Sequence, residues 1–408
     1  MALPLPFEVA RNAQSKKRRE SCMARSPKRM KKLVLHVGAG KCGSTSIQRA
    51  LLRPMVQQAA GISYVELDPK LVSGLVDPDL QTREAMRRAL DAQFARNDSE
   101  LVVFSHEVMG KLPAAVNAIS RRARTQGGIN EVVVVGFTRR QSSYVVAAFK
   151  QWHFRNPKRL AADIEVLTRL ELDPGLFSPL ERHVIAIACR TPEDRPQTYV
   201  PDWNHYYQML MNKAAESDGA VRLESNHIPT KQKSYPLFAD FASRAGIECP
   251  PDVLDEVDKP ANAAFSDALC EAVAEHLSDR DLDSSWIPGP HDDNPWFNTV
   301  SLQFDEAVAK PDPPSPESVL QNAAALIDHR FRDSNMAYCS LMDVEEGYFG
   351  VTERSDISAE SLLEVVWQAH GARNLNDVLE RRRQLIGCLL YTSPSPRDAT
   401  LSRMPSSA

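Results

Sequence analysis

The stretch LVLHVGAGKCGSTSIQRALL, residues 33–52, constrains the fold of this chain more than any other segment. The apolar run at 33–37 predicts a buried strand, and Gly38, Gly40 and Gly43 predict a tight loop. Apolar residues then recur at spacings of three and four, which predicts a helix. A glycine loop between a strand and a helix N-terminus holds phosphate groups on its backbone N–H groups. The segment therefore predicts an anion-binding loop at the end of a strand.

The position of the lysine in this loop indicates which anion it binds. A kinase or ATPase loop reads G-x-x-x-x-G-K-[ST], and its last hydroxyl holds Mg²⁺. Here Ser44 stands where the lysine belongs, and the lysine lies earlier, at Lys41. Enzymes that move a highly charged phosphoryl group use Mg²⁺, whereas a sulfuryl group carries less charge and can be moved without metal. The groups that would suffice are present as backbone amides, Lys41, and the hydroxyls of Ser44, Thr45 and Ser46.

The loop resembles the 5′-phosphosulfate loop of sulfotransferases that use 3′-phosphoadenosine-5′-phosphosulfate (PAPS), whose core is K-[ST]-G-[ST]-[ST]. Here the core reads Lys41-Cys42-Gly43-Ser44-Thr45, and Cys42 replaces the usual hydroxyl residue. The resemblance implies PAPS as the cofactor, no metal, and cofactor contacts from Gly40, Lys41, Cys42, Gly43, Ser44, Thr45 and Ser46. The alternative is a glycine turn that binds nothing.

A second motif, TRRQSSYVVAAFKQ, covers residues 138–151. Sulfotransferases place a strand-end arginine, and a serine eight residues later, around the 3′-phosphate of the cofactor; bacterial-type members often read R-R-Q-D-D-Y-x-x-S-x-Y-x-Q. Arg139 matches the arginine, but Ala147 stands at the serine position. The resemblance implies that Arg139 binds the cofactor in a pocket that lacks one hydroxyl. Ser142 and Ser143 are the candidates to replace it.

Weaker similarities follow in the order of the family: DWNHYYQML (202–210), VRLESN (221–226), FADFASRAGI (238–247) and FRDSNMAY (331–338). The last resembles the C-terminal F-x-x-S-N helix of these enzymes. The resemblance therefore spans roughly residues 31–340.

Sulfuryl transfer needs a base near the acceptor, and the candidates follow the apolar run at 100–105, in FSHEVMG. Related bacterial sulfotransferases carry Ser-x-Glu here, so the resemblance implies Glu107 as the base. His106 is the second candidate, because cytosolic small-molecule sulfotransferases use a histidine. His36, on the first strand, is expected to be a core or supporting residue. Lys41 is expected to stabilise the leaving phosphate.

The acceptor is only partly constrained. QWHFRNPKRL, residues 151–160, mixes aromatic and basic residues that suit a carbohydrate, although the end of an ordinary amphipathic helix fits as well. The expected acceptor is thus a carbohydrate or small molecule with a hydroxyl or amine. Two rival functions remain open. The first is a nucleotide-dependent kinase, but the lysine that a kinase loop needs after Gly43 is absent from this chain. The second is a catalytically inactive relative that binds nucleotide or acts as a scaffold, and Cys42 and Ala147 favour it.

The runs at 33–37, 100–105 and 131–137 are apolar without alternation, which is typical of parallel strands covered on both faces. They predict an α/β, P-loop-type doubly wound fold whose ligand lies at the carboxyl ends of the strands. A further strand is expected at 220–224. Helices are expected at 79–97, 234–246, 264–278, 317–340 and 358–386.

The expected organisation has five parts: a basic leader (1–30), a sulfotransferase-like P-loop domain (31–310), a proline-rich linker (311–316), a helical segment (317–387) and a tail (388–408). The leader has no hydrophobic periodicity, and we interpret it as disordered or as translated upstream sequence rather than as a nucleic-acid tail. The tail breaks from the helical pattern and resembles a translated sequencing adapter. We therefore expect it to make no contact with the core.

Composition narrows the functional class. The net charge of −4 argues against a nucleic-acid partner. The seven cysteines are scattered without a C-x-x-C pair, which argues against a zinc site and fits a reducing compartment. No apolar stretch approaches the roughly 20 residues that span a membrane. The sequence thus predicts a cytoplasmic enzyme without stable membrane insertion.

Overall fold

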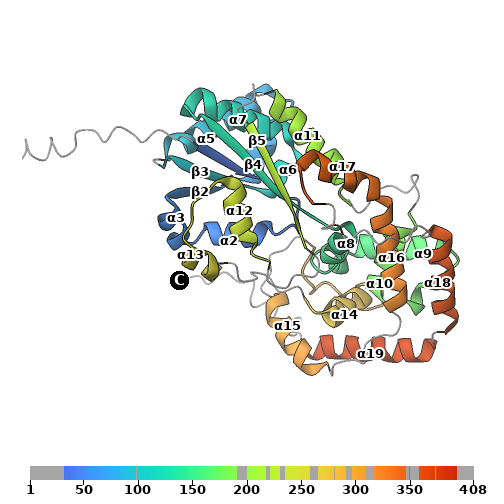
Figure 1. Cartoon of the computed structure of the whole chain (residues 1–408). Coiled ribbons are helices and arrows are strands. Elements are labelled where there is room, and N and C mark those ends of the chain that lie inside the picture. The colour runs from blue at the N-terminus through green and yellow to red at the C-terminus, as the bar shows by residue number, and fades with distance from the viewer. Residues whose placement is uncertain are drawn as a thin grey trace, which may run out of the picture.

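A five-stranded sheet forms the centre of the computed structural model (Figure 1), and all neighbouring strands are parallel. The structure describes residues 32–97, 99–190, 200–216, 221–229, 235–257, 265–279, 281–290, 296–308, 317–345, 349, 358–372 and 374–392. The strands are β1 (Lys32–His36), β2 (Ile62–Glu66), β3 (Leu101–Ser105), β4 (Glu131–Arg139) and β5 (Val221–Ile228).

The strand order is β2-β3-β1-β4-β5, so β1 lies in the middle. From β1 the chain runs to β2 and β3, which lie on one side of β1. It then crosses to β4 and β5, which lie on the other side of β1. Ligands of parallel sheets bind where the connections diverge in this way, at the carboxyl ends of the strands. His36 is paired with Ser105 of β3 and Val135 of β4. Because β4 continues to Arg139, its end projects beyond those of β1 and β3.

Helices cover both faces of the sheet. Packed helices α5, α7 and α11 lie on one face, and α2, α3, α12 and α13 lie on the other (Figure 1). The helices near the sheet are α2 (Ser44–Leu51), α3 (Pro54–Ala60), α4 (Pro69–Gly74), α5 (Leu80–Ala95), α6 (Glu107–Lys111), α7 (Pro113–Gly127), α11 (Trp203–Ala215), α12 (Leu237–Ala245), α13 (Pro251–Val257) and α17 (Arg332–Met342). The expected α/β class with a parallel sheet flanked by helices is confirmed.

A second, helical part lies beside the carboxyl end of the sheet (Figure 1) and has two apolar cores of its own. Its elements are α8 (Gln141–Phe149), η1 (His153–Arg155), α9 (Pro157–Arg169), η2 (Pro174–Leu176), α10 (Pro179–Ala188), α14 (Asp267–Ser278), α15 (Trp296–Ala307), α16 (Glu317–Arg330), α18 (Ala359–Ala372) and α19 (Leu375–Thr392). Helix α16 packs on α8 and α10. Helices that follow the expected linker therefore pack on helices that precede it.

Several expectations need correction. Strand β2 was not expected, because ISYVE lies at the sheet edge and is largely half-exposed. The single helices expected at 317–340 and at 358–386 are each two helices in the structure: α16 followed by α17, and α18 followed by α19. The expected leader (1–30) and linker (311–316) lie outside the described residues. Within the described part of the chain, no helix is long and apolar enough to cross a membrane.

The expectation for the tail, residues 388–408, also needs correction. Helix α19 continues through Thr392, and Leu389 is fully buried in the core formed with α14 and α15. The expectation that residues 388–408 make no contact with the core is therefore wrong for residues 388–392, because this stretch continues the amphipathic pattern of the helix. Residues 393–408 lie outside the described part.

Leu389→Ala is expected to lower the free energy of unfolding by about 2–5 kcal/mol, because it leaves a cavity at a fully buried site. The neighbouring Leu390 is 51% exposed, so Leu390→Ala is the matched control and should change this free energy by less than about 0.5 kcal/mol. Urea unfolding followed by circular dichroism measures both. If the two variants were equally stable, residues 388–392 would not belong to the core.

Candidate functional site

The loop after β1 turns through the left-handed region twice, at Lys41 (φ 70°) and Gly43 (φ 80°). A Cβ on Gly43 would also lie 2.3 Å from the Leu237 side chain, so only glycine fits there. The backbone amides of Gly43, Ser44 and Thr45 donate to no acceptor in the described part of the chain. Helix α2 has no acidic residue in its first turn. Its positive end and these amides therefore point to an anion as the missing partner.

The side chains of the loop face different ways. Ser44 is 2% exposed, and its hydroxyl lies over Gly38, where a Cβ would come within 1.9 Å of it. This buried hydroxyl has no hydrogen-bond partner among the described residues, as expected for a group that hydrogen-bonds to a ligand. Thr45 and Ser46 are half-buried.

Cys42 contributes less than the resemblance implies. Its side chain is buried in the core, and burial raises the pKa of its thiol to about 12. Its amide donates to the Ala39 carbonyl at 3.2 Å. Neither group of Cys42 is therefore offered to a ligand in this conformation of the loop.

Lys41 is held over an aromatic ring. Its Nζ lies 4.7 Å from the centroid of the Trp152 ring, which is a cation–π contact. A Cβ on Gly40 would lie 2.9 Å from the same indole, so Gly40 allows the ring to approach the loop. Burial lowers the pKa of Lys41 to about 8. The charge of Glu107 opposes this shift, and that of Arg139 adds to it.

Glu107 lies beside the same loop. It is the first residue of α6, directly after β3, and its Oε2 lies 3.3 Å from the position that a Cβ on Gly40 would take. Burial raises the pKa of Glu107, whereas the charges of Lys41 and Lys111 act against this. A carboxylate with a raised pKa is a stronger base.

His106, the second candidate base, caps helix α6. Its Nδ1 accepts a hydrogen bond from the Val108 amide at 3.0 Å and so caps α6. Burial lowers the pKa of His106, and the charges that oppose this belong to Glu66 and Asp68, at the end of β2. The structure thus brings Glu107 to the loop and turns His106 towards the neighbouring strand.

Arg139 ends β4 at the other side of the loop. Its carbonyl accepts a hydrogen bond from Trp203 Nε1 at 2.8 Å, which fixes the strand end. Its side chain lies close enough for its charge to lower the pKa values of Lys41 and Cys42. Lys41, Glu107 and Arg139 therefore meet at one site, as expected for the ends of neighbouring parallel strands.

Arg140, the residue just before α8, is bound to a buried carboxylate. Its Nε donates to Asp328 Oδ2 at 2.5 Å, and both side chains are largely buried. The amide and hydroxyl of Ser142 donate to the same carboxylate at 3.0 and 2.7 Å. Ser142 is therefore occupied and does not replace the hydroxyl missing at Ala147. Burial raises the pKa of Asp328, and the charge of Arg140 opposes that shift.

Two of the motifs found in the sequence bind each other. The amides of Gln141 and Asn335 form a reciprocal pair at 2.8 and 3.0 Å, and both residues are buried. Ser334 Oγ donates to Asp202 Oδ1 at 2.5 Å. The Gln141–Asn335 pair joins α17 to the start of α8, next to Arg139, and the Ser334–Asp202 bond joins α17 to the start of α11. We therefore assign them a structural role.

His36 is a buried residue at the end of β1, just before the loop. Its Nδ1 lies 2.8 Å from Ser105 Oγ, which also accepts from Gln48 Nε2 at 3.1 Å. Burial lowers the pKa of His36 to about 3, so the ring is neutral. This agrees with the expectation of a supporting residue.

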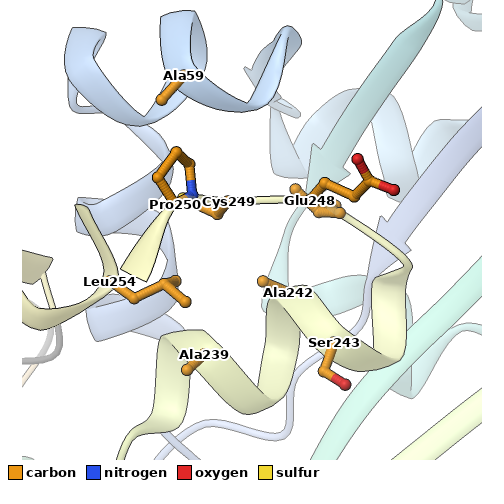
Figure 2. Close-up of a pocket in the computed structure, with 9 residues that line it drawn as sticks. Ala59, Ala239, Ala242, Ser243, Glu248, Cys249, Pro250 and Leu254 are labelled. Carbon is orange, nitrogen blue, oxygen red and sulfur yellow. The ribbon is translucent and has the colours of Figure 1, made fainter. Parts of the chain in front are cut away.

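A separate hollow of about 530 Å³ lies between α3 and the helices α12 and α13 (Figure 2). Small or apolar side chains such as Ala242, Cys249 and Leu254 make up most of its lining. It lies beside Gly246, whose carbonyl accepts from Lys32 at the start of β1, so it is at the opposite end of the sheet from the loop. The hollow does not belong to the site described above.

Binding of a phosphate-bearing ligand is expected to weaken above pH 8. Burial lowers the pKa of free Lys41 to about 8, and a bound anion favours the charged form. Binding at higher pH must then take up a proton, and affinity should fall by up to about tenfold per pH unit. Calorimetric titration with adenosine 3′,5′-bisphosphate between pH 7 and 9.5 measures this. Lys41→Arg keeps its charge and should remove the decline. A wild-type affinity that is constant over this range would show that Lys41 does not touch the anion.

The comparisons with known proteins add no identification. A scan against models of protein families finds no match, and a search of curated proteins finds none either. Among the described residues, no group of three or more His, Cys, Asp or Glu side chains could hold a metal ion. The case for a function therefore rests on the geometry of the loop and its neighbours.

Proposed function

We propose that this protein is a sulfotransferase that moves a sulfuryl group from PAPS to a hydroxyl or amine acceptor, for which a carbohydrate is one candidate. The observation that carries the proposal is the meeting of Lys41, Glu107 and Arg139 around backbone amides that have no acceptor among the described residues. The resemblance of the two sequence motifs supports the same reading.

In this proposal each group has one task. The free amides of the loop and the Ser44 hydroxyl bind the 5′-phosphosulfate, and Arg139 binds the 3′-phosphate. The acceptor oxygen or nitrogen forms a bond to sulfur while the bond from sulfur to the phosphate oxygen breaks. Glu107 takes the proton of the acceptor. Lys41 stabilises the negative charge that develops on the leaving phosphate.

The second candidate is a catalytically inactive relative that binds a nucleotide or acts as a scaffold. Three observations favour it: Cys42 offers neither its thiol nor its amide, Ala147 has no hydroxyl, and Ser142 is tied to Asp328. Such a protein would bind the bisphosphate without turnover. Measurements of binding and turnover on the same samples separate the two candidates.

Arg139→Ala is expected to weaken the binding of adenosine 3′,5′-bisphosphate by about 1.5–3 kcal/mol, because a charge-assisted hydrogen bond to phosphate is lost. This corresponds to roughly 10- to 150-fold in Kd. Arg140→Ala is the control, since Arg140 is bonded to Asp328. It should lower the free energy of unfolding and change the affinity much less. Equal losses of affinity would point to a diffuse basic surface instead of a formed pocket.

Glu107→Gln is expected to lower the rate of sulfuryl transfer by about 10²- to 10⁴-fold, the usual contribution of a general base, while bisphosphate affinity stays within about twofold of wild type. Transfer to water, followed as release of sulfate from PAPS, gives a rate before the acceptor is known. Lys41→Ala should damage both rate and affinity. Glu66→Gln is the matched control, because that carboxylate lies towards His106. Normal turnover by the Glu107 variant would move the base elsewhere.

A further inference from the structure

Trp152 lies against the anion-binding loop but has no role in the proposed transfer. Its amide donates to the Ala148 carbonyl at 2.9 Å, which extends the last turn of α8. Its half-buried side chain packs on the apolar core of the sheet, whereas the nearby Phe154 belongs to a core of the helical part. Trp152 is therefore anchored where the two parts of the molecule meet.

Two contacts place the indole in the site. Its Cη2 and Cζ2 lie 2.9 and 3.7 Å from the position that a Cβ on Gly40 would take, so the ring edge rests on the loop. Glu107 Oε2 lies 3.3 Å from the same position, so the carboxylate and the ring edge are neighbours on Gly40. The ring also carries Lys41, whose Nζ lies 4.7 Å from the ring centroid.

The ammonium of Lys41 therefore lies on the indole and not on the nearby carboxylate. Lys41 and Glu107 attract each other, since each charge acts on the pKa of the other. Within the described part of the chain, however, the two side chains form no ion pair. A lysine stem is flexible, and its end is held here by the cation–π contact with Trp152.

The backbone helps to fix this arrangement. Lys41 has a φ of 70°, which is uncommon for a residue with a Cβ and costs free energy. Residues held in this way are concentrated at ligand sites. The turn sets the direction in which the lysine stem leaves the loop, and the indole contacts the end of that stem.

An ion pair between Lys41 and Glu107 would harm both groups. A positive charge in contact with a carboxylate lowers the pKa of that carboxylate, and Glu107 would then be a weaker base for the acceptor proton. The paired lysine would also be held away from the charge that develops on the leaving phosphate. An aromatic ring attracts the ammonium without carrying a net charge, so the lysine stays available to an anion.

We propose that Trp152 is a positioning residue that holds the Lys41 ammonium away from the Glu107 carboxylate. The inference rests on the proposed sulfuryl transfer, in which the lysine serves the leaving phosphate and the carboxylate serves the acceptor. Without the indole, the lysine and the carboxylate pair with each other, and both lose their function in transfer.

The first test measures the pKa of Lys41 in the full chain without ligand, by ¹³C NMR of protein labelled at the lysine Cε. Lys41→Arg assigns the signal. Trp152→Leu should raise the pKa of Lys41 by about 1 or more, because the ammonium then pairs with Glu107. Trp152→Phe keeps an aromatic face and should raise this pKa less. In a Glu107→Gln background the effect of Trp152→Leu should be much smaller, because the partner is gone.

The matched control is Trp286→Leu, which removes a half-buried tryptophan that packs on Trp296 in the helical part. It should leave the pKa of Lys41 unchanged. The wild type gives a readout that needs no variant to fold: the ring current of Trp152 should shift the Cε protons of Lys41 upfield. An ordinary shift of these protons, a pKa that does not rise in Trp152→Leu, or an equal rise with and without Glu107 would overturn the proposal.

Turnover gives the second test. Release of sulfate from PAPS by the wild type should fall at low pH, as Glu107 takes up a proton. In Trp152→Leu this fall should move to lower pH, because the pair with Lys41 lowers the pKa of the carboxylate. A pH profile that does not move would overturn the proposal. Absence of sulfate release by the wild type would instead overturn the sulfotransferase proposal, and the pKa of Lys41 in the variants would still decide whether Trp152 keeps the two charges apart.

Discussion

The candidate site depends on one backbone constraint, the pair of left-handed turns at Lys41 and Gly43 that ends β1 and starts α2. These turns leave the first amides of α2 without an acceptor among the described residues and direct them to the carboxyl end of the sheet. Gly38 and Gly40 then admit Ser44 and the Trp152 indole at distances that a Cβ would prevent. The glycines thus set the shape of the loop and allow these side chains to pack closely on it.

Burial shifts the pKa values of the charged groups around the loop. Removal from water lowers the pKa of Lys41 and raises that of Glu107, so each group moves towards the pH range in which it can exchange a proton. Their mutual attraction works against both shifts. On the far side, Asp328 and the Gln141–Asn335 pair anchor the start of α8 from the C-terminal helices. The position of Arg139 therefore depends on residues nearly 200 positions away in the sequence.

The sequence was sufficient to predict β1, β3 and β4, because central parallel strands are apolar along their whole length. It was not sufficient for β2, whose half-exposed pattern at the sheet edge gives no such signal. It also predicted that Lys41 and Glu107 share a cleft, since they follow different strands of one parallel sheet, and it placed Arg139 at the end of a third strand. The roles of Trp152 and Asp328 could not be predicted, because they depend on how helices pack; Arg140 and Asp328 are 188 residues apart. The burial of Leu389 shows the same limit at the other end of the chain.

The most direct test of the central claim, that the loop holds a phosphosulfate or bisphosphate without metal, is a comparison of two ligands by calorimetry in the presence of a chelator. Adenosine 3′,5′-bisphosphate should bind, ATP should bind much more weakly, and added Mg²⁺ should not reverse this preference. A kinase-type loop would require Mg²⁺ and select ATP. Preference for ATP with Mg²⁺, or no binding of either ligand, would contradict the account.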